Sequence, residues 1–344
     1  MSALWASVGL SEVVAGIMVL ALNAYVLMGG ADYGGGVWDL LATGSRRDRQ
    51  RELISSSIAP IWEANHVWLI VVVVMLFTAF PAAFSTLGII LHVPITLMLV
   101  GIVLRGSAFV FRSYGRANRA SQRRWGRTFS IASTVTPILL GIIVGALSSG
   151  NVGNAAGRVG AGSFRDVFVA PWTTAYAIAV GLFALALFAY LAAVYLAVAA
   201  SDVELREDFR KRALAAAIVV FAAAMAALYF ARSAAPLVIF GLTGAPWAAV
   251  LHVCTAFAAI VAVVALWRRR YRGARIAVAA QVSFILWGWA FAQYPFIVPS
   301  TLTIDAAAAP RITLELLLAG LAGGAAILIP SLRYLFRTFA TAAE

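Results

Sequence analysis

One stretch of this 344-residue chain decides its fold: Pro60-Ile61-Trp62-Glu63-Ala64-Asn65-His66-Val67-Trp68, within an apolar run from Ile54 to Phe80. The run is long enough to cross a bilayer, for which ~20 residues suffice. Yet it holds a carboxylate, an amide, an imidazole and two indoles. Ionisable groups at membrane depth cost ~2.5–3.5 kcal/mol on insertion scales, and they usually face a bundle interior or a water-filled cavity. The stretch therefore predicts a membrane-spanning helix with a buried polar face.

The composition of the whole chain agrees with a membrane protein. Hydrophobic residues make up 63% of it and charged residues only 12%, and the mean hydropathy is +0.93. A soluble domain would be about a quarter charged. The single cysteine, Cys254, excludes a disulfide framework and a cysteine-based metal site. The net charge of +12 can signal nucleic-acid binding, but it is explained more simply by membrane topology, so no nucleic-acid partner is expected.

Nine apolar runs reach membrane length, which predicts an all-α polytopic protein with nine transmembrane helices. They fall near residues 9–30, 54–80, 84–111, 127–147, 171–200, 212–231, 246–267, 275–298 and 312–336. The first eight runs are spaced as two similar groups of four. We therefore expect two transmembrane halves, residues 1–165 with spans 1–4 and residues 166–344 with spans 5–8 and a ninth, peripheral helix.

The basic residues alternate between the loops. Of the 26 Lys and Arg, 21 fall after spans 1, 3, 5, 7 and 9, and four, Arg158, Arg165, Arg232 and Arg311, fall on the other side. Cytoplasmic loops carry the excess of basic residues, so this pattern predicts an external N-terminus and a cytoplasmic C-terminus.

The remaining basic residue, Arg105, lies inside span 3. With a rise of ~1.5 Å per residue, Glu63 lies ~13 Å and Arg105 ~10 Å from the cytoplasmic side. A short turn at Pro81 would make spans 2 and 3 antiparallel neighbours, so Glu63 and Arg105 are a candidate intramembrane ion pair. The alternative is that Arg105 extends to the cytoplasmic headgroups and never meets Glu63.

Span 1 ends in a glycine-rich segment, residues 29–39, that contains Asp32. Each glycine weakens a helix by ~1 kcal/mol relative to alanine, so the segment predicts close backbone approach or irregular backbone. A phosphate-binding loop is disfavoured, because no G-x-x-x-x-G-K-[ST] motif is present. Asp32 could cap the end of the helix or belong to a functional site.

His66 follows Glu63 by three residues, so both side chains share one face of span 2. That pair suits a proton relay better than a metal site, because no further ligand shares the face. His92 and His252 could together ligate a haem, but neither has a second histidine on its own helix, and haem ligation by this chain is disfavoured. Glu63, His66, Asn65, Arg105 and Asp32 thus predict a proton-handling pocket. From the residues alone, either a redox-complex subunit or a proton-coupled transporter could use it.

Four segments resemble subunit II of the cytochrome bd-type quinol oxidases. They are residues 55–69 with the following Leu76-Phe77-Thr78-Ala79-Phe80-Pro81, residues 104–112, Asp32-Tyr33-Gly34-Gly35-Gly36, and residues 288–295. They occur in the family's order, and the likeness extends over nearly the whole chain. The resemblance implies a respiratory complex of the bacterial cytoplasmic membrane that oxidises quinol and reduces O₂ to water.

The resemblance also implies how this chain contributes to the complex. Subunit II of that family has two four-helix bundles plus one helix and carries no haem. Haem b and haem d are bound by the partner, subunit I, and a small accessory subunit and membrane lipid are further expected partners.

Residue roles follow from the same resemblance. Glu63 matches the family's span 2 acid in the proton path, where many members carry aspartate, and Asp32 and Arg105 match polar positions near that path. Trp62 and Trp68 match family tryptophans, the latter near the route proposed for O₂, and Asn65 lies between them as a further candidate that faces gas or partner. A second acid present in some members corresponds here to Gly29.

Overall fold

The computed structural model describes residues 9–58, 62–114 and 119–341, and within them the side chains of residues 58, 62–64, 113–114, 119–120, 332 and 335–341 are not described. Almost all of this chain is helical. The elements in order are α2 (Leu10–Leu40), α3 (Arg47–Ile58), α4 (Trp62–Ala79), α5 (Pro81–Ile90), α6 (His92–Tyr114), α7 (Arg119–Ser148), α8 (Asn151–Ala156), α9 (Phe164–Phe168), α10 (Ala175–Ala199), α11 (Val203–Ala234), α12 (Pro236–Gly244), α13 (Ala248–Trp267), α14 (Tyr271–Gln293), β1 (Phe296–Val298), β2 (Leu302–Thr303), α15 (Ile304–Ala307) and α16 (Arg311–Thr341).

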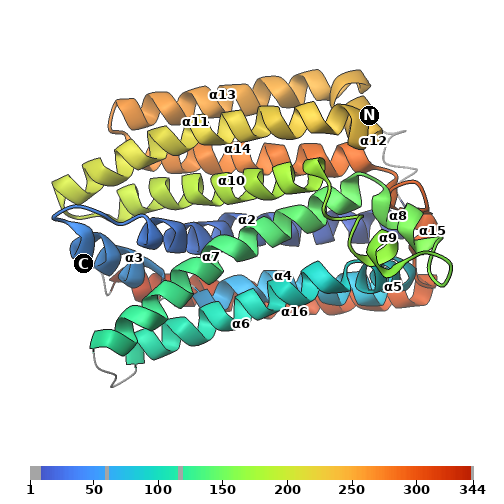
Figure 1. Ribbon diagram of the computed structural model, residues 1–344, viewed down its shortest axis with the longest axis horizontal. Helices are drawn as coiled ribbons and strands as arrows, with labels where there is room; N and C mark the ends of the chain where they lie inside the picture. The colour runs from blue at the N-terminus through green and yellow to red at the C-terminus, as the bar shows by residue number, and fades with distance from the viewer. Residues whose placement is uncertain (1–8, 59–61, 115–118, 342–344) are drawn as a thin grey trace.

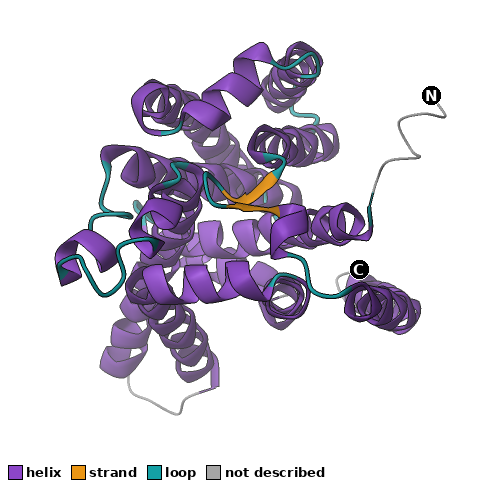
Figure 2. Ribbon diagram, turned by 90° about the vertical axis from the view of Figure 1, so that its right-hand side faces the viewer, coloured by secondary structure: helices purple, strands orange, loops and turns teal. Residues whose placement is uncertain are grey.

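The long helices lie side by side along one axis (Figure 1). Helices α2, α4, α6 and α7 form one group, which we call the first helix group, and α10, α11, α13 and α14 form the second helix group. Short helices and the β1–β2 hairpin cover the right-hand end of Figure 1, which faces the viewer in Figure 2. Helix α10 packs on α2 and α7 as well as on α11 and α14, so it joins the two groups. The division at residue 165 stays a prediction.

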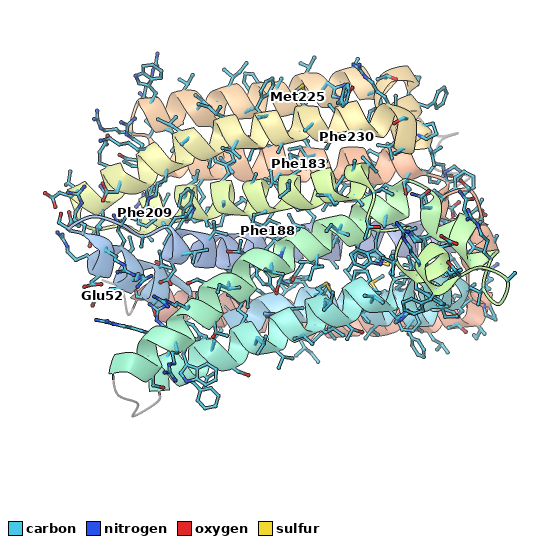
Figure 3. The ribbon with its side chains drawn as sticks, in the orientation of Figure 1. Glu52, Phe183, Phe188, Phe209, Met225 and Phe230 are labelled. Carbon is cyan, nitrogen blue, oxygen red and sulfur yellow. The ribbon has the colours of Figure 1, made fainter. Side chains whose placement is uncertain are left out.

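Among the described residues, eight helices are long and apolar enough to cross a membrane, or nine if the bent pair α4–α5 counts as one span. The outer surface is apolar. Met225 and Phe230 of α11 are exposed, whereas Phe188 and Phe209, labelled with them in Figure 3, are buried in contacts between helices. An exposed apolar surface of this extent is expected where helices face lipid. The chain is therefore a multi-pass membrane protein, and its exact span count and orientation stay predictions.

The segment around Pro81 differs from the expected short turn. Helix α4 ends at Ala79, and the chain bends by 115° into the ten-residue helix α5 before α6 begins at His92. Proline disfavours helical backbone at the residue before it, and Phe80 has φ −133° and ψ 60°. Helix α4 packs mainly on α2 and α16, while α6 packs mainly on α7. The prediction that spans 2 and 3 pack as direct neighbours joined by a tight turn was wrong.

The first helix is longer than expected. Helix α2 continues through the glycine-rich segment to Leu40, so Asp32 lies inside the helix. Of the two alternatives for Asp32, the helix cap was wrong. The glycines allow close packing. A Cβ at Gly34 would overlap the backbone carbonyl of Phe188, and one at Gly30 would lie 2.9 Å from the Phe188 ring. The approach of α10 to α2 thus offsets the low helix propensity of glycine.

The connections rich in arginine gather at the left-hand end of Figure 1, where α3 lies and where α10 leads into α11 and α13 into α14. We call this the basic end. The charge alternation of the sequence thus corresponds to one end of the folded molecule.

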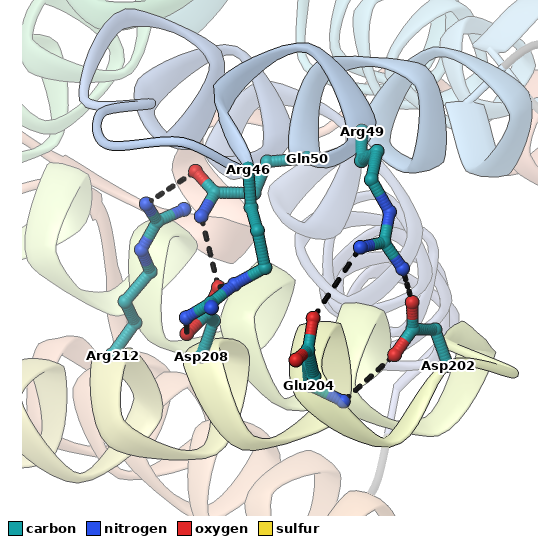
Figure 4. A network of polar contacts seen from close by, with 7 residues as sticks. All are labelled: Arg46, Arg49, Gln50, Asp202, Glu204, Asp208 and Arg212. Atoms are coloured by element: carbon teal, nitrogen blue, oxygen red, sulfur yellow. Dashed lines mark hydrogen bonds and ion pairs between the residues drawn. The ribbon is translucent and has the colours of Figure 1, made fainter.

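A polar network at the basic end ties α3 to α11 (Figure 4). Asp208 accepts hydrogen bonds from Arg46 at 2.6 and 2.8 Å and from the Gln50 amide at 3.0 Å, and Gln50 in turn accepts one from Arg212 at 2.8 Å. Nearby, Arg49 pairs with Asp202 and, at 3.3 Å, with Glu204. The hydrogen bond to Asp208 raises the pKa of Arg46. The network fixes the short connection 41–46 against the second group of helices.

Candidate functional site

The interior of the first group holds a buried ion pair. Arg105 of α6 donates through one terminal nitrogen to a carboxylate oxygen of Asp32 on α2, and its Nε donates to the Ser133 hydroxyl of α7 at 3.0 Å. The two charged side chains are 2% and 0% exposed. Arg105 therefore does not extend to the headgroups, and that part of the alternative was wrong.

Aromatic rings complete the surroundings of Arg105. Its guanidinium carbon lies 4.6 Å from the centre of the Tyr33 ring and 5.2 Å from that of Phe129. Contacts of this kind stabilise a desolvated cation by ~2 kcal/mol or more. Breaking a buried pair by removing one partner costs ~3–5 kcal/mol, since the other charge is left buried and uncompensated. Asp32, Arg105 and Tyr33 are therefore one unit in which each group depends on the others.

A second acid–arginine pair lies two helical turns nearer the basic end. Asp39 of α2, 1% exposed, accepts from Arg112 of α6 at 3.1 Å and from the Ser130 hydroxyl of α7 at 2.6 Å. Each pair combines an aspartate of α2, an arginine of α6 and a serine of α7. The first set is Asp32, Arg105 and Ser133, and the second is Asp39, Arg112 and Ser130. We call this arrangement the two-pair ladder.

Sequence reasoning missed Asp39, although it had a usable signal. Asp32 and Asp39 are seven residues apart, as are Arg105 and Arg112, which is the spacing of two turns on one helix face. Arg51 of α3 approaches the same acid, with Nε 3.7 Å from the Asp39 carboxylate and two hydrogen bonds to its backbone carbonyl. Burial lowers the pKa of Arg51, and the nearby Asp39 carboxylate offsets this only in part.

Helix α4 brings further polar groups to the other side of Tyr33. The His66 and Tyr33 ring centres are 6.5 Å apart, and Trp68 packs against the cluster formed by Tyr25, Tyr33 and Phe188. Asn65 is fully buried. Arg105, His66 and Trp68 thus lie around Tyr33, with Asp32 beside Arg105 and Asn65 next to His66 on α4. Their roles in proton transfer and gas access stay predictions.

Several buried polar atoms in this region have no hydrogen-bond partner among the described residues. They are Oδ2 of Asp32, the hydroxyls of Tyr25 and Tyr33, both polar side-chain atoms of Asn65 and Nε1 of Trp68. An unpaired buried polar group costs ~1–3 kcal/mol. Such groups usually form hydrogen bonds with ordered water or with a binding partner. This region is therefore suited to bind water molecules and to contact a partner.

Glu63 and Trp62 belong to α4, but their side chains lie outside the described part of the structure. Arg105, the arginine predicted to pair with Glu63, has Asp32 as its carboxylate partner. The Glu63–Arg105 pair therefore stays an untested prediction, and any such contact would add to the pair already formed with Asp32.

The two histidines considered as haem ligands, His92 and His252, lie on separate helices, α6 and α13. His92 shares a hydrogen bond with the Ile89 carbonyl at 2.9 Å, and its ring packs against Phe164 and Phe168. His252 is exposed on α13, apart from this region. Within the described residues, no group of three potential metal ligands comes together. The expectation that haems bind elsewhere in a complex stays a prediction.

These features define a class: a multi-pass helical membrane protein whose first helix group encloses buried ion pairs and unpaired polar groups. A sequence profile of the cytochrome bd terminal oxidase subunit II family matches residues 10–339, and the chain belongs to that family. The family assignment confirms the resemblance found in the sequence and does not favour a transporter.

Individual relatives agree. The chain is 32% identical over 105 residues to the cytochrome bd-I ubiquinol oxidase subunit 2 of Escherichia coli (strain K12), covering 30% of this chain and 27% of that one. It is 25% identical over 135 residues to the cytochrome bd ubiquinol oxidase subunit 2 of Bacillus subtilis (strain 168), covering 39% of each. These alignments thus span about a third of the curated relatives.

The fold is shared with a solved structure. The bd oxidase from Geobacillus thermodenitrificans superposes with a TM-score of 0.79 over 96% of this chain and 98% of the matched chain, at 22% identity. At that identity the comparison establishes the fold alone.

Proposed function

We propose that this chain is subunit II of a quinol oxidase that couples quinol oxidation to the reduction of O₂ to water. The observation that carries the proposal is the family match over residues 10–339. In this proposal the chain has no redox chemistry of its own. It supports assembly with a haem-bearing subunit I and supplies protons taken from the cytoplasm.

The polar groups of the first helix group support a route for those protons. The two-pair ladder leads from Asp39, beside the partly exposed Arg51 and Arg112, to Asp32 and Arg105. Tyr33 then leads to His66 and Asn65 on α4. We assign proton transfer to Glu63, Asp32 and His66, with Arg105 holding the Asp32 carboxylate in place. Trp62, Trp68 and Asn65 are proposed to face O₂ or the partner.

The remaining parts of the proposal concern the complex. Haem b and haem d bind to subunit I and supply the electron transfer and the O₂ chemistry. A small accessory subunit is a further proposed partner. The location is the bacterial cytoplasmic membrane, with the basic end facing the cytoplasm, because basic loops are enriched on that side.

The test is Glu63→Gln in the complex purified with its partner subunits. Glutamine keeps the size and polarity of the side chain but cannot release a proton at neutral pH. We expect slower quinol-driven O₂ consumption together with an unchanged haem content in the reduced-minus-oxidised spectrum. Glu52→Gln, at a described position of α3 near the basic end, is the matched control and should leave turnover unchanged (Figure 3).

Two results would count against the proposal. Unchanged turnover of Glu63→Gln at full haem content would remove Glu63 from the proton route. The absence of a haem d band from the purified wild-type complex would reject the oxidase itself.

A further inference from the structure

A hollow of about 440 Å³ opens at the basic end of the second helix group. The end of α10, the start of α11 and the turn between α13 and α14 surround it, and four arginines line it: Arg206, Arg269, Arg270 and Arg272. Small-molecule sites in proteins have volumes of ~300–1,000 Å³. The hollow is thus large enough for a small anionic group.

Two of the four arginines are held by the protein and shape the wall. Arg206 donates to the Ala200 carbonyl at 2.6 and 3.0 Å, and its guanidinium lies 5.6 Å from the centre of the Tyr271 ring. Arg269, whose φ is 57°, lies 3.5 Å from the Glu207 carboxylate, which is bonded more closely to Arg210. Glu207, at one edge of the hollow, is therefore already paired with two arginines.

The other two arginines have no such partner. Arg270 and Arg272 are exposed, and neither side chain forms a hydrogen bond or ion pair with the described residues. They flank the start of α14, where Arg270 is the N-cap residue and forms no side-chain cap. The first N–H groups of a helix lack partners within it and favour a negative charge. Two free guanidinium groups and an uncapped helix start thus face the same hollow.

The surroundings favour an amphipathic ligand over a free ion. Ala197 and Val198 form the apolar part of the lining. Beside the turn, Trp267 and Ile276 are 74% and 70% exposed on helices long enough to cross a membrane. Tryptophan is enriched at the level of lipid headgroups. A ligand here would contact arginines with its head and an exposed apolar surface with its tail.

We propose that this hollow binds the phosphate group of an anionic phospholipid, with Arg270 and Arg272 as its direct partners. Basic pockets between membrane helices are a recognised form of lipid-headgroup site, and arginine matches phosphate oxygens with two parallel donors. Arg206 and Tyr271 hold the wall, and the acyl chains lie along α13 and α14. The site lies in the other helix group from the ladder, so it does not depend on the proposed oxidase activity.

The test measures lipid binding to the full-length chain, purified with its accompanying subunits and stripped of lipid by detergent exchange. Phosphatidylglycerol and phosphatidylcholine are added back and counted by native mass spectrometry. We expect phosphatidylglycerol to bind more tightly. Arg270→Gln/Arg272→Gln should weaken its binding about tenfold or more, since each basic residue near a membrane surface contributes ~1 kcal/mol.

Arg268→Gln/Arg275→Gln is the matched control, because it removes the same charge from exposed arginines of the same segment that do not line the hollow. We expect little change in binding. Arg270→Lys/Arg272→Lys keeps the charge but loses the parallel donors of arginine, so its affinity should lie between those of the wild type and of the glutamine pair.

Three outcomes would overturn the proposal. Equal weakening by the two glutamine pairs would indicate general surface attraction, with no site at the hollow. Loss of affinity in the lysine pair as large as in the glutamine pair would show that charge does not hold the lipid. Displacement of the lipid by inorganic phosphate alone would identify a site for free anions.

Discussion

Arg105 and Asp32 form an ion pair that is almost completely shielded from solvent, with the Arg105 side chain 2% and the Asp32 side chain 0% exposed. The two residues come from different helices, α6 and α2. Their interaction is strengthened by a hydrogen bond to Ser133 and by the Tyr33 and Phe129 rings. Buried charges are retained at such depth mainly where they serve function, because desolvation removes much of the gain in stability.

Removing one charge of this pair should destabilise the protein more than removing both. Arg105→Met leaves Asp32 buried and uncompensated, with an expected cost of ~3–5 kcal/mol. The double variant Asp32→Asn/Arg105→Met leaves no net buried charge and should recover most of that stability. The measurement is thermal unfolding of the purified complex. A double variant no more stable than Arg105→Met would contradict the account of the pair as mutually compensating charges.

Close packing of α2 on α10 should make Gly34 intolerant of a side chain. Gly34→Ala places a Cβ against the Phe188 carbonyl, and overpacking of this kind costs ~1–3 kcal/mol. Gly16→Ala is the matched control in the same helix, since nothing lies within 4 Å of the added Cβ there. The control should be neutral or stabilising by up to ~1 kcal/mol, because alanine has the higher helix propensity. Unfolding curves that shift equally for both variants would refute the close approach.

The sequence predicted the helical membrane class, the location of the basic end and the polar region around Asp32 and Arg105, because hydropathy and loop charge depend on local composition. It did not predict that the glycine-rich segment stays helical. The helix is stabilised there by Phe188, more than 150 residues away in the sequence, which packs directly against the backbone of Gly30 and Gly34. Likewise, depth along the membrane pointed to Glu63 and gave no reason to pair Arg105 with Asp32, which the sequence placed at the end of span 1. The pair with Asp32 depends on the packing of α2 beside α6 and α7, and the pair with Glu63 stays untested.

The pair between Arg46 and Asp208 should contribute modestly to stability and respond to salt. Arg46 is 38% exposed and Asp208 16%, so solvent screens the interaction in part. We expect Asp208→Asn to lower stability by about 1 kcal/mol at low salt, and by less at high salt. The control is Glu315→Gln, which breaks the exposed Arg311–Glu315 pair and should change stability by at most ~0.5 kcal/mol. Equal effects of the two variants would argue against a stabilising network between α3 and α11.

A buried hydroxyl joins α7 to α14 at the end of the molecule opposite the basic end. Ser148 of α7, 2% exposed, accepts a hydrogen bond from the Trp289 indole of α14 at 2.7 Å. Its hydroxyl donates to the Val144 carbonyl at 2.7 Å and, more weakly, to the Gln293 amide oxygen at 3.4 Å. Ser148→Ala would leave these buried groups unpaired, at an expected cost of ~1–3 kcal/mol. Thr255→Ala is the control, because the Thr255 hydroxyl donates to the Leu251 carbonyl of its own helix. Its loss removes no contact between helices, so the loss of stability should be smaller. We expect Ser148→Ala to melt at a lower temperature than Thr255→Ala and to change the fluorescence of Trp289. If the two variants melt at the same temperature, the serine does not couple the two helix groups.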